Sequence, residues 1–257
     1  FGGVPWADLP LSIHDIERVE VSRGPNAVTY GANAFLAVIN IITRGAAEDT
    51  GGRYVVTQDL DEGSVTQDIY ARFGKNHGNL DWKISASQEQ DDGFEDYFKS
   101  TSKQETQDAK LLKKLNIWTD YQIDPDQVLS IQLGINDSLV DTGDNSGTDP
   151  YREVDTTNSF QNIRWDLVGD DVETTLKLMH TRHRVEDAFL ATEEFFIADV
   201  NFDRTSDRLD LELFQNRLVA DGVTLNYGIN LRRDEVKSRY LFNTGLSFEV
   251  ESTNLFS

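Results

Sequence analysis

The chain lacks several features on which common protein functions depend. Its 257 residues include no cysteine, which excludes disulfide bonds, thiolate metal sites and a cysteine nucleophile. No run of residues reaches the roughly eighteen apolar positions of a transmembrane helix. The first residues, Phe1-Gly2-Gly3-Val4, have neither the basic start nor the apolar core of a signal peptide.

Positive charge is also scarce. Lysine and arginine total 24 against 45 aspartates and glutamates, which gives a net charge of −21. No basic patch offsets this charge, so nucleic acid and anionic lipid are disfavoured as partners. The length suffices for one large domain or two ordinary ones.

The motifs of common enzyme classes are missing as well. The sequence has no G-x-S-x-G nucleophile elbow and no glycine-rich phosphate loop between a strand and a helix. His180 and His183 are three residues apart and would point to opposite faces of a strand, so a shared metal is not expected. The aspartates between Asp137 and Asp155 lack the order of a calcium loop, and a solvated loop explains them better. We expect no catalytic residue, no metal site and no cofactor.

The most distinctive stretch runs from Asp15 to Thr43. It begins with a β-branched run, Ile16–Val21, which predicts a short strand that Arg23-Gly24-Pro25 ends. A second apolar run, Val38–Thr43, does not alternate, which predicts a strand buried on both faces. From these residues alone, a strand–turn–strand unit of any α/β or β protein fits equally well.

The amino-acid sequence of this stretch resembles the closing segment of the plug domain in TonB-dependent outer-membrane receptors. In that family an IERIEV-type strand leads into RGP, then YG, and then a VINIIT-type strand. The same elements follow one another here over about thirty residues. The residues that carry the resemblance are Ile16, Glu17, Arg18, Glu20, Arg23, Gly24, Pro25, Tyr30, Gly31 and Asn40.

The resemblance implies a role for one of these residues. In similar receptors the arginine of the RGP motif pairs with glutamates of the barrel and holds the plug in place, so Arg23 is the candidate latch. A cation that faces a polar barrel wall needs such a partner. The alternative is a solvated turn arginine. Glu17, Arg18 and Glu20 are expected to be salt-bridged or solvated.

Beyond the small polar connector 45–52, the sequence alternates with a period of two. Short turns are predicted near 74–78, 124–126, 169–171 and 220–222, and long polar stretches near 90–106, 138–156, 186–203 and 236–253. Alternating short turns and long loops are typical of an outer-membrane barrel. The apolar faces include Val65, Ile69, Ala71 and Phe73; Leu80, Trp82, Ile84 and Ala86; Leu129, Ile131, Leu133 and Ile135; and Val223, Leu225, Tyr227 and Ile229.

Charged and aromatic residues are sorted between the two faces. The central basic residues fall on the polar face, as expected where a lipid-facing cation would cost roughly 2–4 kcal/mol. Aromatic residues close to the short turns fall on the apolar face, where an interfacial aromatic belt is expected. The basic residues are Arg72, Lys83, Lys114, Arg164, Lys177, Arg208 and Arg232; the aromatic residues are Phe73, Trp82, Tyr121, Trp165 and Tyr227.

We therefore predict a mainly β fold: a partial transmembrane antiparallel β-barrel of about nine strands, preceded by the end of an α+β plug domain. Residues 1–48 would be the C-terminal part of the plug, and 49–257 the N-terminal part of the barrel. A β-bulge is expected near Phe214, where the alternation slips. Since the family needs a signal peptide and a TonB box, we expect the chain to be a fragment.

The resemblance implies a receptor of the Gram-negative outer membrane that takes up a scarce solute, most often a ferric siderophore. Its partners would be the TonB–ExbB–ExbD complex, the extracellular ligand and outer-membrane lipid, and it would not be an enzyme. Two other classes stay open. A passive porin or barrel enzyme would lack the RGP stretch or show a nucleophile with its base, and a soluble acidic carbohydrate-binding module would lack the loop alternation.

Overall fold

A computed structural model describes residues 8–24, 36–61, 64–93, 98–99, 102–103, 107–144, 146–220, 222–238 and 247–256. No helix in these ranges has the length and apolar character to cross a membrane. The elements are η2 (Ile13–Asp15), β1 (Ile16–Arg23), β2 (Ala37–Thr43), β3 (Gly51–Asp61), β4 (Ser64–His77), β5 (Leu80–Asp91), β6 (Phe98–Lys99), β7 (Ser102–Lys103), β8 (Lys110–Asp124), β9 (Gln127–Thr142), β10 (Arg152–Val168), β11 (Val172–Glu186), β12 (Ala188–Glu193), β13 (Phe196–Asn201), β14 (Arg204–Ala220), β15 (Val223–Lys237) and β16 (Ser247–Phe256).

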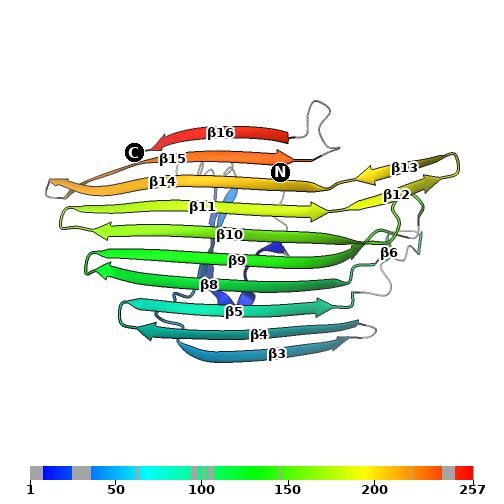
Figure 1. Ribbon diagram of the computed structural model, residues 1–257, viewed down its shortest axis with the longest axis horizontal. Helices are drawn as coiled ribbons and strands as arrows, with labels where there is room; N and C mark the ends of the chain where they lie inside the picture. Colours follow the sequence, from blue (N-terminus) through cyan, green and yellow to red (C-terminus); the bar gives the residue numbers. More distant parts are fainter. Residues whose placement is uncertain are drawn as a thin grey trace.

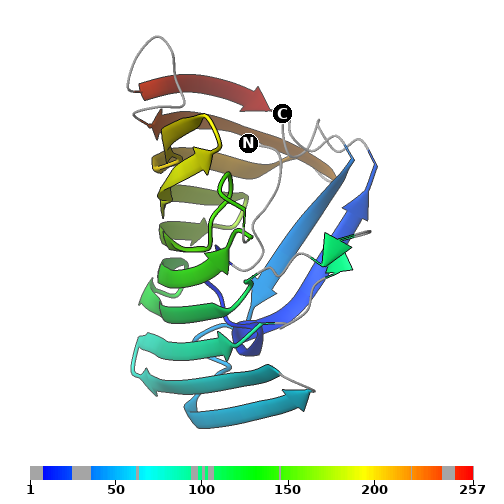
Figure 2. The same cartoon turned by 90° about the vertical axis from the view of Figure 1, so that its right-hand side faces the viewer.

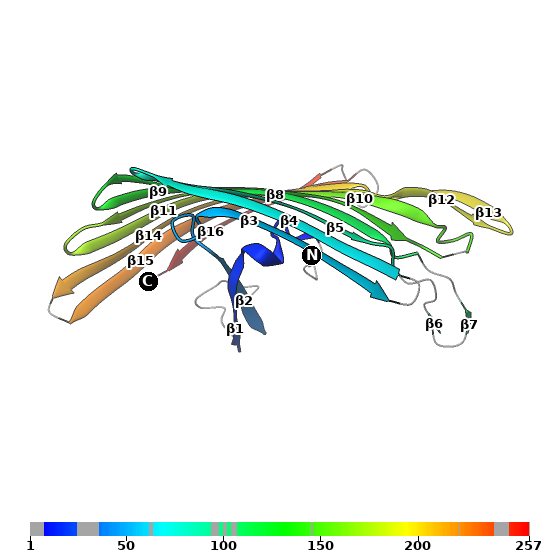
Figure 3. The same ribbon diagram turned by 90° about the horizontal axis from the view of Figure 1, so that it is seen from below.

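Ten strands form one antiparallel sheet in the order β16-β15-β14-β11-β10-β9-β8-β5-β4-β3 (Figure 1). Each strand pairs with the next large strand along the chain, and the register between β10 and β11 runs without a shift from Asp155↔Glu186 to Val168↔Glu173. The sheet is curved, and β1 and β2 cross its concave side as a separate two-stranded sheet (Figure 2). Seen along its edge, the large sheet is an arch from which β1 and β2 project (Figure 3).

The two faces of the sheet have opposite character, as the alternation predicted. On the concave side, which we call the inner face, Lys83, Asn116 and Asn136 are buried. Their neighbours Ile84, Leu115 and Ile135 point to the convex outer face and are exposed. A soluble β-protein buries its apolar face. The reverse arrangement here matches a barrel wall with an apolar outside and a polar inside.

The connections between the strands agree with the predicted pattern in most places. Short turns join β4 to β5, β8 to β9, β10 to β11 and β14 to β15. Longer connections lie at the other end of the sheet. There β9 and β10 extend into the predicted long stretch 138–156, so that only residues 143–151 separate the two strands. The predicted strict alternation of short turns and long loops is wrong at one place. At the end of the sheet that carries the long loops, only residues 62–63 separate β3 from β4.

Three predictions need correction. The sheet has ten strands rather than about nine, because β16 completes an antiparallel pair with β15. The strand Val38–Thr43 is not buried on both faces: it pairs only with β1 among the described strands, and Ile39 is 46% exposed. The bulge near Phe214 is also wrong, because Phe214 keeps its register opposite Gly228 and the shift lies between Leu218 and Ala220.

The sidedness of β9 can be tested with two neighbouring substitutions. Leu133 is exposed on the outer face, whereas Gln132 lines the cavity on the inner face. In the full-length protein, Leu133→Arg is expected to destabilise the membrane-inserted state by roughly 2–4 kcal/mol, because the cation would face lipid. Gln132→Arg should cost far less. The measurement is folding into lipid vesicles during urea titration, and equal losses for both variants would contradict the assigned faces.

Candidate functional site

The hairpin formed by β1 and β2 contains most of the described signature residues. The strands are antiparallel from Arg18↔Ile42 to Arg23↔Ala37, with an irregularity between Ile16 and Arg18. Arg18 pairs with Glu17 at 2.9 Å and with Glu20 at 2.8 Å. Hydrogen bonds from Arg18 and Asn40 lower the pKa of Glu20. All four of these polar residues are exposed on the hairpin surface.

Arg23 is the last residue of β1 and is exposed. It forms no ion pair with any residue of the described ranges. Gly24 follows with a φ of 119°, a conformation that favours glycine, and its N–H donates to the carbonyl of Leu36 at 2.9 Å. The signature residues Pro25, Tyr30 and Gly31 lie outside the described residues.

The segment before β1, residues 8–15, lies against the inner face of the large sheet. Asn158 of β10 donates to the carbonyl of Asp8 at 2.9 Å. Ser138 of β9 donates to the Asp8 carboxylate at 3.2 Å, and Lys114 of β8 donates to the carbonyl of Leu11, also at 3.2 Å. Three neighbouring strands thus hold this segment, mostly through its backbone.

Asp15, at the end of η2, is the centre of the first buried polar cluster. Its side chain is fully buried and accepts hydrogen bonds from the hydroxyls of Tyr70 at 2.8 Å and Ser85 at 2.7 Å. The neighbouring His14 contacts Asp68 at 2.8 Å and lies against the Tyr70 ring. A buried carboxylate is stable only with such partners. The cluster therefore fixes η2 to β4 and β5.

The connector predicted at 45–52 runs from 44 to 50 in the structure, and a second cluster fixes it to the same strands. Asp49 pairs with Arg72 at 2.8 Å and with the fully buried Lys83 at 3.3 Å. Lys83 also donates to the carbonyl of Arg44 at 2.7 Å and lies 4.3 Å from the centre of the Trp118 ring. Asp49 approaches β4 so closely that a Cβ on Gly74 would collide with its carbonyl oxygen, so the glycine makes this contact possible.

The two clusters are linked to each other through the ends of the hairpin. The Arg44 N–H donates to the carbonyl of Asp15 at 3.1 Å, and its guanidinium donates to the carbonyl of His14, also at 3.1 Å. Both ends of the β1–β2 hairpin are therefore tied to each other and to the wall. We call this set of contacts the hairpin anchor: Asp15, Arg44, Asp49, Tyr70, Arg72, Lys83 and Ser85.

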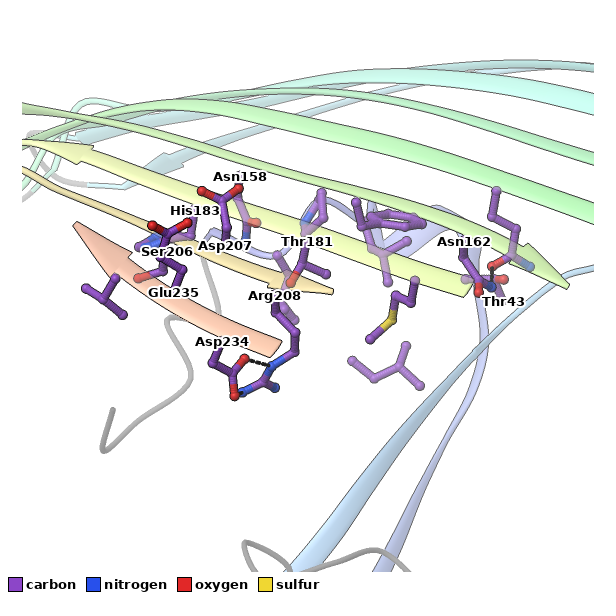
Figure 4. A pocket seen from close by; sticks show the side chains of 18 of the residues that line it. Thr43, Asn158, Asn162, Thr181, His183, Ser206, Asp207, Arg208, Asp234 and Glu235 are labelled. Atoms are coloured by element: carbon purple, nitrogen blue, oxygen red, sulfur yellow. Dashed lines mark hydrogen bonds and ion pairs between the residues drawn. The ribbon is translucent and has the colours of Figure 1, made fainter. Parts of the chain in front are cut away.

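A cavity of about 840 Å³ lies beside the anchor, between the inner face and the segment that holds Leu9 and Leu11. Figure 4 shows the polar side chains of its wall, with Thr43 of β2 close to them. Its wall is mixed: Phe160 and Met179 are apolar, whereas Asn158, Asn162 and Thr181 can form hydrogen bonds. One ion pair, Arg208 to Asp234 at 2.6 Å, borders it. The cavity therefore offers a few hydrogen-bonding side chains beside a larger apolar surface.

The period-two alternation of the sequence correctly placed Arg72, Lys83 and Lys114 on the inner face, but it did not identify the anchor. Asp15 and Asp49 lie in irregular segments, so no periodicity connects them to the strands that they contact. The sequence did contain one signal. Arg72 and Lys83 lie close together on the polar faces of two neighbouring predicted strands, and buried cations need carboxylate partners.

The five predicted interface aromatics lie on the outer face near the short turns. The rings of Phe73 and Trp82 are 5.7 Å apart, and Tyr121 is exposed. The indole N–H of Trp165 donates to Gln127 at 3.2 Å, and the Tyr227 hydroxyl donates to Gln215 at 2.6 Å. Apolar rings with satisfied polar atoms suit a membrane interface.

The two histidines of β11 lie on opposite faces, as predicted. His183 lines the inner cavity, whereas His180 contacts Gln161 at 2.7 Å and Asp207 at 3.2 Å. Within the described ranges, no group of three potential metal ligands is found.

Comparisons with known proteins place these features in context. No family model matches the chain. It is 28% identical over 139 residues to the iron-regulated outer membrane virulence protein of Vibrio cholerae, which covers 52% of this chain and 20% of that protein. It is 32% identical over 94 residues to the vitamin B12 transporter BtuB of Vibrio vulnificus, which covers 37% of this chain and 15% of that protein. The chain therefore spans about a fifth of the length of these curated relatives or less.

Solved structures share the fold at lower identity. The siderophore receptor PirA of Acinetobacter baumannii matches with a TM-score of 0.76 and 14% identity, over 94% of this chain and 40% of that one. The ferric enterobactin receptor PfeA of Pseudomonas aeruginosa matches with a TM-score of 0.71 and 15% identity, over 95% of this chain and 42% of that one.

Proposed function

Because this chain belongs to the TonB-dependent outer-membrane receptor family, we propose that it serves the energised uptake of a scarce solute, with a ferric siderophore as the first candidate. The family consists of non-enzymatic transporters of the Gram-negative outer membrane. The observation that carries the proposal is a hairpin with the RGP signature anchored to the polar inner face of an antiparallel sheet.

We propose that residues 1–48 are the end of the plug and that residues 49–257 are the first part of the barrel. The separate β1–β2 sheet and the start of the large sheet at Gly51 support this division. In the same scheme, Phe73, Trp82, Tyr121, Trp165 and Tyr227 contact outer-membrane lipid at the interface near the short turns. Their outward position beside an exposed apolar band supports this role.

The proposed mechanism requires no chemistry on the solute. The long connections and the plug bind the ligand from outside, and the TonB–ExbB–ExbD complex pulls on a segment of the plug to open a passage. The cavity beside the anchor is a candidate part of that passage, because it lies between the plug segment and the wall. An inner wall with amide and hydroxyl groups can exchange hydrogen bonds with a passing hydrated solute.

Two relatives point to two solute classes. The first is named for iron regulation, which favours a ferric siderophore, and the second is named as a vitamin B12 transporter, which makes cobalamin the second candidate. The test is uptake of radiolabelled ferric siderophores and cobalamin by cells that carry or lack the full-length gene. Saturable uptake that requires both the gene and TonB supports the proposal. Uptake that persists without TonB would instead indicate a passive porin.

Arg23 provides a test of the proposed latch. In the full-length receptor, Arg23→Ala is expected to lower uptake several-fold and to admit a large antibiotic that the outer membrane normally excludes, since an unlatched plug blocks the barrel less well. Arg23→Lys should retain part of the function through its charge. Arg18→Ala is the matched control, because Arg18 pairs with Glu17 and Glu20 of its own strand. Equal phenotypes for Arg23→Ala and Arg18→Ala would show that Arg23 is an ordinary turn residue.

A further inference from the structure

The hairpin of β12 and β13 extends beyond the large sheet at its long-loop end (Figure 1). Its two strands pair from Ala188↔Asn201 to Glu193↔Phe196, and the two-residue turn Glu194-Phe195 joins them. It continues the direction of β11 and β14 at the end that faces the cell exterior in the proposed orientation. We call it the outer hairpin.

The base of the outer hairpin is held firmly. The Arg152 guanidinium pairs with Asp187 at 2.6 Å and lies 3.9 Å above the centre of the Phe189 ring. The ring centres of Phe189 and Phe202 are 6.2 Å apart, and the Phe202 N–H donates to the carbonyl of Asp187 at 2.7 Å. Asp187 in turn donates its N–H to Asp203 at 2.8 Å. These contacts set the position of the tip, so the tip can present a fixed surface.

One edge of the outer hairpin is occupied and the other is open among the described residues. The Thr192 N–H of β12 donates to the carbonyl of Gly147 at 2.6 Å, so Gly147 occupies the β12 edge at Thr192. Within the described strands, β13 pairs only with β12. In a two-residue hairpin the closing pair exchanges hydrogen bonds and the next pair does not. The backbone N–H and C=O of Thr192 therefore point away from β13, as its hydrogen bond to Gly147 shows. By the same alternation, the backbone N–H and C=O of Ile197 and Asp199 point away from β12, to the open edge.

The tip beside this edge is apolar and acidic. Phe195 is 92% exposed and Ile197 is 75% exposed. Glu193, Glu194 and Asp199 are exposed around them. Rigid apolar side chains held in water, with an unpaired strand edge beside them, are features of a protein interaction site.

We propose that the open edge of β13 is a docking site for an extended polypeptide segment of a partner protein outside the cell. The segment adds as a strand to β13, places an apolar side chain against Ile197 and Phe195, and brings a lysine or arginine two residues further along, on the same face, to Asp199. Glu193 and Glu194 make the surroundings acidic and favour a basic segment. The proposal concerns the outer hairpin alone and does not depend on which solute the receptor transports.

Shape and charge favour this occupant over three others. A small solute needs a concave pocket, whereas this tip projects. Anionic lipid would be repelled by the three carboxylates. The outer hairpin of a second copy would bring the same carboxylates together, which disfavours self-association through this edge.

The test uses the purified full-length receptor in detergent at physiological salt. The probe is a short synthetic peptide in which an isoleucine and a lysine stand two positions apart with a threonine between them, and its scrambled isomer of equal composition and charge is the control. We expect this peptide to bind about tenfold more tightly than the scrambled isomer, because only the two-residue spacing brings isoleucine to Ile197 and lysine to Asp199 on the same face of the strand. Equal binding of the two peptides would overturn the proposal, since it would reflect net charge alone.

Two substitutions at one position separate the strand edge from the charge. Asp199→Pro removes the outward N–H and the carboxylate, whereas Asp199→Asn removes the charge only. We expect Asp199→Pro to weaken binding about tenfold and Asp199→Asn about threefold. Phe195→Ser with Ile197→Ser, which leaves the β12–β13 backbone pairing in place, should also abolish the preference. Equal binding by Asp199→Pro and wild type, or no binding by wild type, would show that the edge is not a docking site.

Discussion

The Asp49→Ala variant of the full-length receptor is expected to release the connector from the wall. Asp49 is the carboxylate partner of Arg72 and of the fully buried Lys83. Removing one partner of a buried ion pair leaves an uncompensated charge and costs roughly 3–5 kcal/mol. The Arg44 amide, whose N–H donates to the carbonyl of Asp15 and whose own carbonyl accepts from Lys83, should therefore exchange roughly 10²–10³-fold faster.

The matched control for this substitution is the neighbouring residue. Glu48→Ala also removes one carboxylate, but Glu48 is exposed, so exchange in the connector should stay within a few-fold of wild type. The double variant Asp49→Asn with Lys83→Met removes the charges of Asp49 and Lys83 and leaves only Arg72 without its carboxylate. It should recover part of the protection, because the apolar replacement of Lys83 avoids one of the two uncompensated charges. If Glu48→Ala and Asp49→Ala accelerated exchange equally, the ion pairs would not be what holds the connector.

Asp15→Ala is expected to loosen the other end of the hairpin. The substitution removes the acceptor for two buried hydroxyls, those of Tyr70 and Ser85. Each unsatisfied buried group costs roughly 1–3 kcal/mol, so docking of η2 should weaken by roughly 2–6 kcal/mol. The Arg44 N–H reports this change, because it donates to the carbonyl of Asp15 and should exchange much faster once η2 detaches.

A variant without the two hydroxyls tests the cause. Tyr70→Phe and Ser85→Ala, combined with Asp15→Ala, leave no buried polar group without a partner at this position. The triple variant is therefore expected to protect Arg44 better than Asp15→Ala alone, since an apolar cluster avoids the desolvation cost. A triple variant as exposed to exchange as the single one would mean that η2 docks through its backbone contacts alone.

The strand pattern could be predicted from the sequence because each wall strand keeps one apolar and one polar face. Leu115 beside Asn116 and Ile135 beside Asn136 carry this signal, and the structure assigns them to outer and inner faces. Phe214 led to a wrong prediction, because an aromatic residue on the polar inner face looks in the sequence like a one-residue shift of the alternation. Gly228 lies opposite it, and Gly134 likewise lies opposite Phe160, whose ring a Cβ on that glycine would strike. Glycine leaves room for an inner aromatic residue, a pairing that hydrophobic periodicity does not detect.

The anchor could not be predicted in the same way. Its carboxylates, Asp15 and Asp49, come from a short turn and a connector, whose residues follow no period. The contacts between Asp15 and Ser85 or between Asp49 and Lys83 depend on how far the connector folds back over β4 and β5. The exposure of β2 was mispredicted for a related reason, because a continuous apolar run records hydrophobicity and not which surface covers it.

The central claim is that these strands cross the outer membrane with lipid on one face and a polar interior on the other. Because the chain has no cysteine, single cysteines at Leu176, Leu178, Met179 and Thr181 of β11 can each carry a spin label in the full-length protein in vesicles. We expect labels at Leu176 and Leu178 to be relaxed mainly by oxygen, which dissolves in lipid, and labels at Met179 and Thr181 mainly by a water-soluble nickel complex. Equal access of the nickel complex to all four positions would contradict the membrane-spanning assignment.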